Sequence, residues 1–599
     1  MIYHCEDHTC NYWDEGEKLP ERCPQCGRKL LRANETDMTG DDWTALGNTL
    51  WDAEASDKKR MVDCFRKAAY LGSAWGVCNL GICMEQGNGV EADPVQAFWL
   101  YQQAVEMGSL NAVCCLGVCY QYGIGTAPDA EKAAELYCKA AEYGSPRGQM
   151  LLARAFHDGI GVEADAAEAV HWVRAAAYQR YGEGMYRLGV CYEYGDGVEQ
   201  NWEHAVHWFR EAAESGVSVA MTDLGYCYEK GCGVEQSWEQ AFSWYRRGAE
   251  CGDLRSMHNL GYCYEKGRGV EQSWEQAFSW YRRGAECGYP VSMSNLGLCY
   301  KRGYGVEQNW QEAIKWYEQG AQCGHLQSMD NLAYCYEYGE GVEQNEERAL
   351  YWYRRGAEAG SDYCMYCLGW NYSNGEGVEQ NMTEAIRWYT AAAEGGNADA
   401  MHDLGWHYDH GEGVEQDMKK AICWYERAAE QNHPAAMNSL GECYAMGRGV
   451  PRDLETAMEW YRRAAELGEA MADYNMGWHL EQAGKLSEAY AHYRKAADGN
   501  DDSAWWALGR FYENGVVVAQ DGKEARRCYE TGEKLGSVKC KMRLARCKLL
   551  GIGGRREKKA GLDLCRQALE LAKESSEKED YGYEAEMNLL RRTIAENES

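Results

Sequence analysis

An internal repeat constrains the fold of this chain more than any other feature of its sequence. A Leu-Gly-like pair returns every 36 residues from Leu80 to Met476, and further copies begin at Leu46, Leu508 and Leu544. The length of 599 residues would otherwise suggest about four domains. A fixed period of this size instead indicates stacked supersecondary units. We therefore predict fifteen units between about residue 40 and about residue 575.

Each unit is predicted to hold two antiparallel helices. Around Leu224, small and apolar residues recur at helical spacing. This first helix ends at Gly-x-Gly-Val, a sequence found ten times, whose glycines can adopt the positive φ that closes a helix. The second helix begins at a residue such as Ser237, with Gln240 three positions later, which is the spacing of a capping box. It continues through Ala-x-x-Trp-Tyr, as at Trp244 and Tyr245.

These three motifs at this period resemble the Sel-one-like repeat family, relatives of the tetratricopeptide repeats. The resemblance covers most of the chain and implies an all-α fold, a right-handed α-solenoid of about fifteen helix-turn-helix repeats. It also implies that the first helices line the concave face, and that the protein is a scaffold or adaptor for other proteins. One helix pair cannot bury its own apolar stripe, so stacked neighbours form a continuous core. The units at Leu46 and Met476 lack Gly-x-Gly-Val and look closer to tetratricopeptide repeats.

The two ends of the chain differ from the solenoid, which we assign to residues 36–555. Residues 556–599 are predicted to form two charged amphipathic helices that cap the last repeat, with a partner-binding tail as the alternative. The leucines expected to cover that repeat are Leu562, Leu564, Leu569 and Leu571. Residues 1–35 are predicted to form a small domain of their own.

The cysteines of residues 1–35 predict a metal site. Two pairs separated by twelve residues can converge on one ion, and thiolates favour zinc. We predict a structural Zn²⁺ bound by Cys5, Cys10, Cys23 and Cys26. The first pair is more widely spaced than usual, so His4 or His8 could replace one sulfur, and iron is an alternative ion. The segment resembles small zinc ribbons of the rubredoxin-like kind.

The remaining cysteines are predicted to be free thiols that fill space between helices. Nine occupy one repeat position: Cys83, Cys119, Cys191, Cys227, Cys263, Cys299, Cys335, Cys443 and Cys547. Secreted members of the family that this chain resembles carry a disulfide in each repeat. Their paired positions fall here on residues such as Ala249 and Met257, so that framework is missing. Unpaired thiols agree with a reducing compartment.

The charge of the chain disfavours several kinds of partner. A net charge of −32 repels phosphate backbones and anionic lipid, so we expect no general nucleic-acid binding. A nucleic-acid regulator acting through the zinc ribbon is kept as an alternative. No apolar run approaches the ~18 residues of a membrane span, and the first ten residues lack the features of a secretory signal. We expect a monomeric, cytoplasmic protein without membrane insertion.

Catalytic signatures are absent from the sequence. It contains no Gly-x4-Gly-Lys-Ser/Thr, His-Glu-x-x-His or Gly-x-Ser-x-Gly motif, so we predict that the protein is not an enzyme. Cys364-x2-Cys367 lies in a repeat helix and lacks the strand context of a redox motif. Two side chains of one cluster could share a metal or a proton, which keeps a hydrolase-type enzyme as an alternative. That cluster is His402, Asp403, His407 and His410.

One face of the first helices is predicted to bind a partner. The residue before each repeat Leu, the second after it and the sixth after it share this face, which we call the first-helix face. From residue 223 to residue 410 it carries amides and acids beside aromatic rings. Amides can bond the backbone of an extended peptide, and rings can bury its side chains. We predict a groove anchored by Trp370, Trp406, Asn331 and Asp403; the alternative is that both tryptophans pack between units. The predicted contact residues are Asp223, Tyr226, Asn259, Tyr262, Asn295, Asn331, Tyr334, Trp370, Asp403, Trp406, His410 and Trp478.

Overall fold

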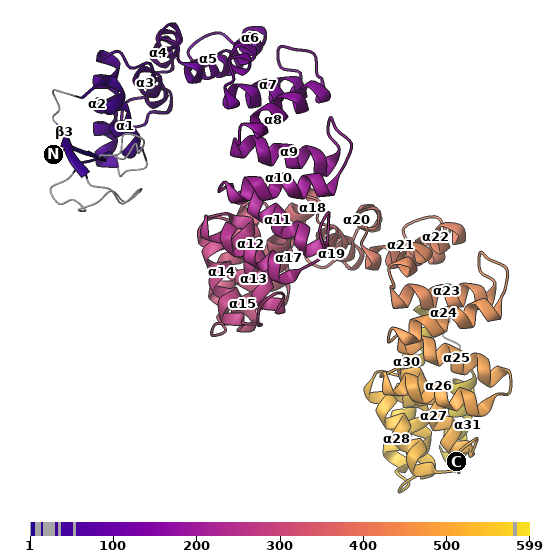
Figure 1. Ribbon diagram of the computed structural model, residues 1–599. Helices are drawn as coiled ribbons and strands as arrows, with labels where there is room; N and C mark the ends of the chain where they lie inside the picture. Colours follow the sequence, from indigo (N-terminus) through magenta and orange to yellow (C-terminus); the bar gives the residue numbers. More distant parts are fainter. Residues whose placement is uncertain are drawn as a thin grey trace. The chain divides into compact units, whose positions relative to one another are not determined.

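The computed structural model describes residues 2–5, 13–15, 30–33, 38–51, 55–578 and 584–598. These residues form three strands and 31 helices, and the chain divides into two compact units, 1–309 and 310–599. Antiparallel helices follow one another as pairs along each unit (Figure 1). We call the odd-numbered helices from α1 to α29 first helices and their even-numbered successors second helices. The helical repeat architecture that the sequence predicts is confirmed.

Unit 1 begins with a small antiparallel sheet of strand order β2-β1-β3. The strands are β1 (Ile2–Cys5), β2 (Trp13–Glu15) and β3 (Leu30–Ala33), and Tyr3 lies opposite both Asp14 and Arg32. Three of the predicted zinc ligands, Cys10, Cys23 and Cys26, lie outside the described residues. Cys5 is described only as the last backbone position of β1. The zinc site therefore stays a prediction.

The helices agree with the predicted 36-residue unit, and most are 13 residues long. Those of unit 1 are α1 (Gly40–Thr49), α2 (Ala55–Tyr70), α3 (Ala74–Gln86), α4 (Pro94–Glu106), α5 (Leu110–Tyr122), α6 (Ala130–Glu142), α7 (Pro146–Asp158), α8 (Ala166–Tyr178), α9 (Gly182–Tyr194), α10 (Trp202–Glu214), α11 (Ser218–Lys230), α12 (Trp238–Glu250), α13 (Leu254–Lys266), α14 (Trp274–Glu286) and α15 (Pro290–Arg302). Those of unit 2 are α16 (Trp310–Gln322), α17 (Leu326–Tyr338), α18 (Glu346–Glu358), α19 (Asp362–Asn374), α20 (Met382–Gly395), α21 (Ala398–His410), α22 (Met418–Glu430), α23 (Pro434–Met446), α24 (Leu454–Glu466), α25 (Ala470–Gln482), α26 (Leu486–Asp498), α27 (Asp502–Asn514), α28 (Gly522–Lys534), α29 (Val538–Leu550), α30 (Lys558–Lys578) and α31 (Glu584–Glu598).

The helix ends follow the glycine and capping motifs. Gly231 closes α11 with a φ of 76°, and the Ser237 side chain accepts a hydrogen bond from the Gln240 backbone N–H at the start of α12. Only this half of the predicted capping box forms, because the Ser237 backbone N–H, from which the Gln240 side chain would accept, donates to the backbone carbonyl of Tyr228 at 2.9 Å. The α11–α12 loop is fastened by Gln236, whose amide donates to the backbone carbonyl of Glu229 at 2.7 Å.

Tyrosines of the second helices form the centre of the core. Tyr245 is fully buried, and its hydroxyl donates to Glu229 at 2.8 Å. A Cβ placed on Gly225, next to the repeat Leu, would lie 2.6 Å from the Tyr245 ring, so glycine gives the ring room. The tryptophan before the core tyrosine is less deeply buried: Trp244 is 9% exposed. Trp280, before Tyr281, is half-buried under the Arg283 guanidinium, whose carbon is 5.2 Å from the ring centroid.

The cysteines from Cys64 to Cys565 are free, as the sequence predicts, and most are buried. Burial raises the pKa of the Cys443 thiol to about 11, so this thiol is protonated at neutral pH. Such a protonated, buried thiol is inert and behaves as a small apolar side chain.

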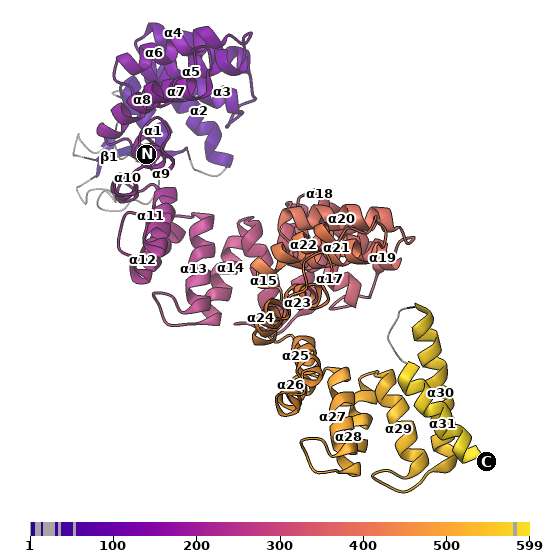
Figure 2. The same ribbon diagram turned by 90° about the vertical axis from the view of Figure 1, so that its right-hand side faces the viewer.

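The C-terminal helices differ in part from the predicted cap. α30 packs against α29 as the second helix of a last repeat, and α31 contacts both (Figure 2). The leucine prediction is wrong for Leu571, which is 38% exposed, because Cys565, Ala568 and Ala572 form the buried stripe of α30. Glu586 of α31 accepts a hydrogen bond from Arg543 of α29 at 2.7 Å. In the part of the chain that the structure describes, no helix combines the length and apolarity needed to cross a bilayer.

Candidate partner-binding face

Neighbouring first helices are joined by a ladder of polar contacts. The residue two before the repeat Leu of one unit contacts the residue one before the Leu of the next, 37 positions along the chain. The contacts are Tyr186–Asp223 (2.9 Å), His258–Asn295 (3.5 Å), Tyr366–Asp403 (3.2 Å), His402–Ser439 (3.4 Å) and Asn438–Asn475 (3.0 Å). Sequence reasoning singled out His402, as part of the histidine cluster, but missed the other first members, Tyr186, His258, Tyr366 and Asn438. The recurrence of polar residues at that repeat position was the signal that could have revealed them.

The acid of the unit 1 part of the first-helix face is already paired. Asp223 accepts hydrogen bonds from the Tyr186 hydroxyl and from Arg255, the latter at 3.1 Å. Burial raises the pKa of Asp223, and the Arg255 cation opposes that rise. Tyr226 is the next residue of this face on α11. It is 44% exposed, with the Lys230 ammonium 5.7 Å from its ring centroid. The exposed ring, not the carboxylate, is free to contact a partner.

The next two repeats of unit 1 show the same division between paired and free groups. The Tyr262 ring lies 5.3 Å from the Arg268 guanidinium, which also donates to its hydroxyl at 3.0 Å. Asn295 contacts His258 in the ladder. Asn259 is half-buried, and no hydrogen bond of its amide is found within the described residues.

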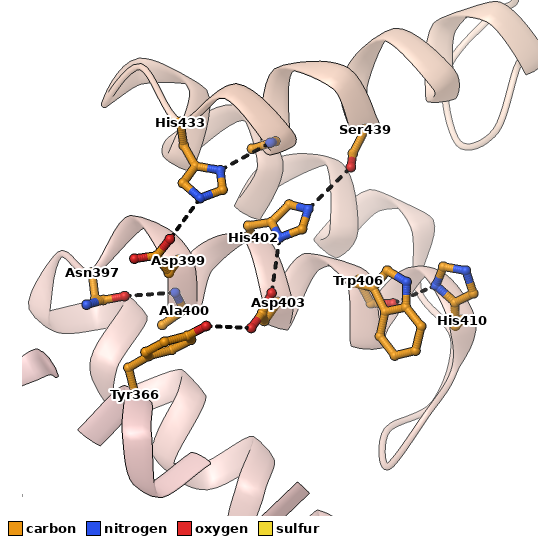
Figure 3. Close-up of polar contacts among 11 residues, drawn as sticks. Tyr366, Asn397, Asp399, Ala400, His402, Asp403, Trp406, His410, His433 and Ser439 are labelled. Atoms are coloured by element: carbon orange, nitrogen blue, oxygen red, sulfur yellow. Dashed lines mark hydrogen bonds and ion pairs between the residues drawn. The ribbon is translucent and has the colours of Figure 1, made fainter. Parts of the chain in front are cut away.

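The unit 2 part of the face carries the largest exposed rings. Trp370 is 37% exposed and Trp478 is 43% exposed, whereas Trp406 is half-buried and stacks on His410 with centroids 4.3 Å apart (Figure 3). Tyr334 is also half-buried, and its ring centroid lies 4.6 Å from that of Tyr338. Asn331 of α17 is half-buried, without a hydrogen bond to its amide in the described part of the chain.

Asp403 belongs to a network that joins α19, α21 and α23. One carboxylate oxygen accepts from the Tyr366 hydroxyl, and the other contacts Nδ1 of His402 at 3.1 Å (Figure 3). Nε2 of His402 lies 3.4 Å from the Ser439 hydroxyl, and the ring stacks on His433 at 5.2 Å. The network places an acid, a histidine and a serine in contact.

The order Ser439–His402–Asp403 is that of a catalytic triad, but the surroundings differ from a hydrolase site. Ser439 lies in the middle of α23, where backbone N–H groups bond the carbonyls four residues earlier. They cannot form the oxyanion hole that acyl transfer requires. The His402–Ser439 contact is also one rung of the ladder that other repeats build from tyrosine, asparagine and aspartate. Its evident role is to join α21 to α23.

The other members of the predicted histidine cluster do not converge with this network. His407 is buried, its Nδ1 lies 3.0 Å from the Glu412 carbonyl oxygen, and burial lowers its pKa. His410 is exposed and contacts the Trp406 carbonyl at 3.0 Å. No group of three or more potential metal ligands is found among the described residues. Cys364 donates to Asp330 at 3.0 Å, and burial raises its pKa, which opposes thiolate chemistry.

A comparison with protein families decides the identity of the repeats. The model described as "Sel1 repeat" matches fourteen stretches: residues 76–109, 112–145, 146–181, 182–217, 218–253, 254–289, 290–325, 326–361, 362–397, 398–433, 434–469, 470–501, 504–537 and 538–573. This chain belongs to the Sel1 repeat family. Sel1 repeat proteins are generally protein-interaction scaffolds and are typically non-enzymatic. The predicted unit at Leu46 lies outside the matched stretches, whereas the unit at Met476 lies within one.

This chain is also similar to solved structures. A protective antigen of uropathogenic Escherichia coli strains, which displays an SLR fold, is 32% identical over 75% of this chain and 97% of its own, with a TM-score of 0.52. A Sel1 repeat protein from Oxalobacter formigenes is 27% identical over 51% of this chain and 89% of its own, with a TM-score of 0.41. A comparison with curated proteins found no match.

Proposed function

We propose that this Sel1 repeat protein is a scaffold whose first-helix face binds an extended peptide segment of a partner protein, with Trp370 and Trp406 as the main anchors. The observation that carries the proposal is that the two tryptophans occupy the same repeat position. Both stand two residues after the repeat Leu of consecutive first helices, α19 and α21, and both present ring surface outside the core. Large aromatic side chains in that setting are the residues that most often dominate binding energy.

The neighbouring amide supports a peptide as the occupant. Asn331 of α17 stands at the preceding repeat with unused hydrogen-bonding groups, and an extended backbone needs such partners along its length. Asp403 contributes differently from the sequence-based prediction. Each of its oxygens already has a partner, Tyr366 or His402, so it holds those side chains in place more than it binds a ligand directly.

The test uses a displayed library of random twelve-residue peptides selected on the full-length chain. The double variant W370A/W406A should weaken binding of the selected peptides by at least about 2 kcal/mol, or about 30-fold. The midpoint of thermal unfolding should change little, because neither ring belongs to the buried core.

A matched control removes exposed tryptophan surface elsewhere. Trp99 lies on the second helix α4 and is exposed, so W99A should leave peptide affinity unchanged. The assignment of the anchors is wrong if W370A/W406A unfolds at a clearly lower temperature while the chain that remains folded still binds the selected peptides.

A further inference from the structure

A pocket of about 500 Å³ opens between α7, α8 and α9 in unit 1. Its floor is apolar and includes Ala153, Val170 and Val173, all of them buried. Its rim is charged and includes the exposed side chains of Arg154 and Arg187. No residue of this pocket belongs to the predicted contact set.

The pocket lies at the one repeat between residues 101 and 461 whose core position carries no aromatic ring. Between residues 101 and 461, every 36th residue is aromatic except Val173: Tyr101, Tyr137, Phe209, Tyr245, Tyr281, Tyr317, Tyr353, Tyr389, Tyr425 and Tyr461. In the preceding repeat, the Tyr137 ring would lie 2.5 Å from a Cβ on Gly117, and its hydroxyl donates to Gln121 at 2.7 Å.

All three positions of that arrangement have changed together in the α7–α8 repeat. Val173 replaces the tyrosine, Ala153 replaces the glycine that its ring contacts, and His157 replaces the acceptor of its hydroxyl. These three residues all line the pocket. The space that a tyrosine ring fills in the neighbouring repeats is therefore part of this pocket.

Among the described residues, most charged groups on the rim already have partners. Arg154 and His157 both contact Asp158, at 3.3 Å and 2.6 Å, and His157 also pairs with Asp196 at 3.3 Å. Arg147 donates to Asn111 at 2.6 Å. Glu183 accepts a long hydrogen bond, 3.5 Å, from the Tyr181 hydroxyl.

Arg187 has no hydrogen bond or ion pair within the described residues, and its side chain is exposed. The Arg187 guanidinium is therefore available to an anionic group at the rim of the pocket. Its fork of N–H donors matches the geometry of a carboxylate.

We propose that this pocket binds an aromatic side chain of a partner peptide whose adjacent residue is aspartate or glutamate. The aromatic ring occupies the space of the missing tyrosine ring, against Ala153 and Val173, and the neighbouring carboxylate pairs with Arg187. The proposal rests on the peptide-binding function but not on Trp370 and Trp406 as its anchors.

The decisive variant is A153G/V173Y, which fills the pocket with the residues that other repeats use. We expect it to fold like the parent chain, as measured by thermal unfolding. The probe is again the displayed library of random twelve-residue peptides. Selected peptides that carry an aromatic residue next to Asp or Glu should bind A153G/V173Y at least tenfold more weakly, and so should R187A.

Controls separate this site from the other anchors and from general charge effects. Synthetic versions of the selected peptides, amidated at the C-terminus, should lose affinity tenfold when the aromatic residue becomes Ala or the acidic residue becomes its amide. R246A removes a comparably exposed arginine from α12 and should have no effect. W370A/W406A should not weaken this class of peptide.

The proposal is overturned if no selected peptide depends on the pocket. It is also overturned if peptides of the expected class lose affinity only on W370A/W406A, an outcome that leaves the scaffold function intact. R187E changes an exposed side chain and decides the question should A153G/V173Y fold poorly: unchanged binding by R187E contradicts the proposal.

Discussion

Asp501 shows how burial can make a helix cap depend on pH. It is the N-cap of α27 and accepts a hydrogen bond from the Ala504 N–H at 2.6 Å, yet it is only 8% exposed. Burial raises its pKa from 3.8 to about 6. Because the folded chain binds this proton more tightly than the unfolded chain, the contribution of Asp501 to stability grows as the pH falls from 7 through 6 toward 4.

The variant D501N should therefore stabilise the protein near neutral pH. Asparagine keeps the cap and removes the buried charge, so we expect the free energy of unfolding of the C-terminal repeats to rise by about 1–3 kcal/mol at pH 7. The gain should disappear near pH 4. Urea unfolding at the two pH values, with amide exchange in α27 as the local probe, measures the difference.

D453N in the exposed cap of α24 is the matched control for D501N. Hydrogen bonds from Thr456 lower the pKa of Asp453, so its stabilising contribution is present above pH 3.8 and is lost as the pH falls through the lowered value. D453N should lower stability at neutral pH. If D501N is less stable than the parent chain at pH 7, the buried charge of Asp501 does not destabilise the folded state.

The sequence could place the core tyrosines but not their hydrogen bonds. The period identifies Tyr281 as a core position, whereas its bond to Glu265 at 2.8 Å joins residues 16 apart on two helices. That contact depends on the angle between the helices, which a hydrophobic pattern does not fix. Trp280 stands next to Tyr281 in the same motif, yet it is only half-buried. The hydrophobic pattern does not predict this difference in burial.

At the scale of the element, the Gly-x-Gly loop joins repeats as well as ending a helix. The second glycine of the α11–α12 loop, Gly233, has a φ of 69°, and a Cβ there would lie 2.3 Å from the carbonyl oxygen of Trp202 in the previous repeat. Gly252 after α12 also has a positive φ, 88°, but open space around it. Gly252 therefore serves only its left-handed backbone conformation, whereas Gly233 also leaves the space that a Cβ would fill.

We expect G252A and G233A to differ in cost for this reason. G252A should lower the free energy of unfolding by about 1–2 kcal/mol, through the left-handed backbone alone. G233A adds the displacement of a neighbouring helix and should cost about 1–3 kcal/mol more. Urea unfolding gives both values, and amide exchange should show the extra loss of protection at the N-terminus of α10, where Trp202 lies. Equal losses in the two variants would mean that the loop does not brace the previous repeat.

Element boundaries were the most predictable part of the fold. Ser237 and Gly231 mark the ends of their helices because capping chemistry is local and leaves a sequence pattern. The C-terminal helices were less predictable. Nothing in residues 556–599 signals that α30 buries Cys565 and Ala568 in place of Leu571, because small residues carry the close packing there.

At the scale of the whole molecule, the repeat explains both what could be predicted and what was missed. The first-helix face follows from helical spacing, so the positions of Trp370 and Trp406 could be predicted. The recurrence of polar residues two before the repeat Leu could have indicated the positions of the ladder. Their partners could not be predicted, because Tyr186 meets Asp223 only through the stacking angle of successive repeats. The α7–α9 pocket could have been found, since Val173 interrupts a column of aromatic residues in the sequence itself.

The stacking of repeats also determines how far along the chain a local loss of structure extends. Each repeat contacts mainly its neighbours, so the loss of a terminal segment should leave distant repeats folded. The sheet of residues 2–33 provides such a segment. Its strands are only three or four residues long, and a sheet of this size needs a further source of stability. We propose that Zn²⁺ bound by Cys5, Cys10, Cys23 and Cys26 supplies it, since structural zinc contributes about 10–16 kcal/mol in small domains.

We therefore expect about one zinc per chain in the purified protein, measured by elemental analysis. A strong chelator should remove the metal and leave the helical circular dichroism signal almost unchanged, because the repeats do not depend on the N-terminal segment. C23S/C26S should contain no zinc, whereas C251S/C287S, which changes two exposed cysteines of the repeats, should retain it. A metal-free protein with reduced, rapidly reactive Cys23 and Cys26 contradicts the zinc site, and a collapse of the helical signal on chelation contradicts the independence of the repeats.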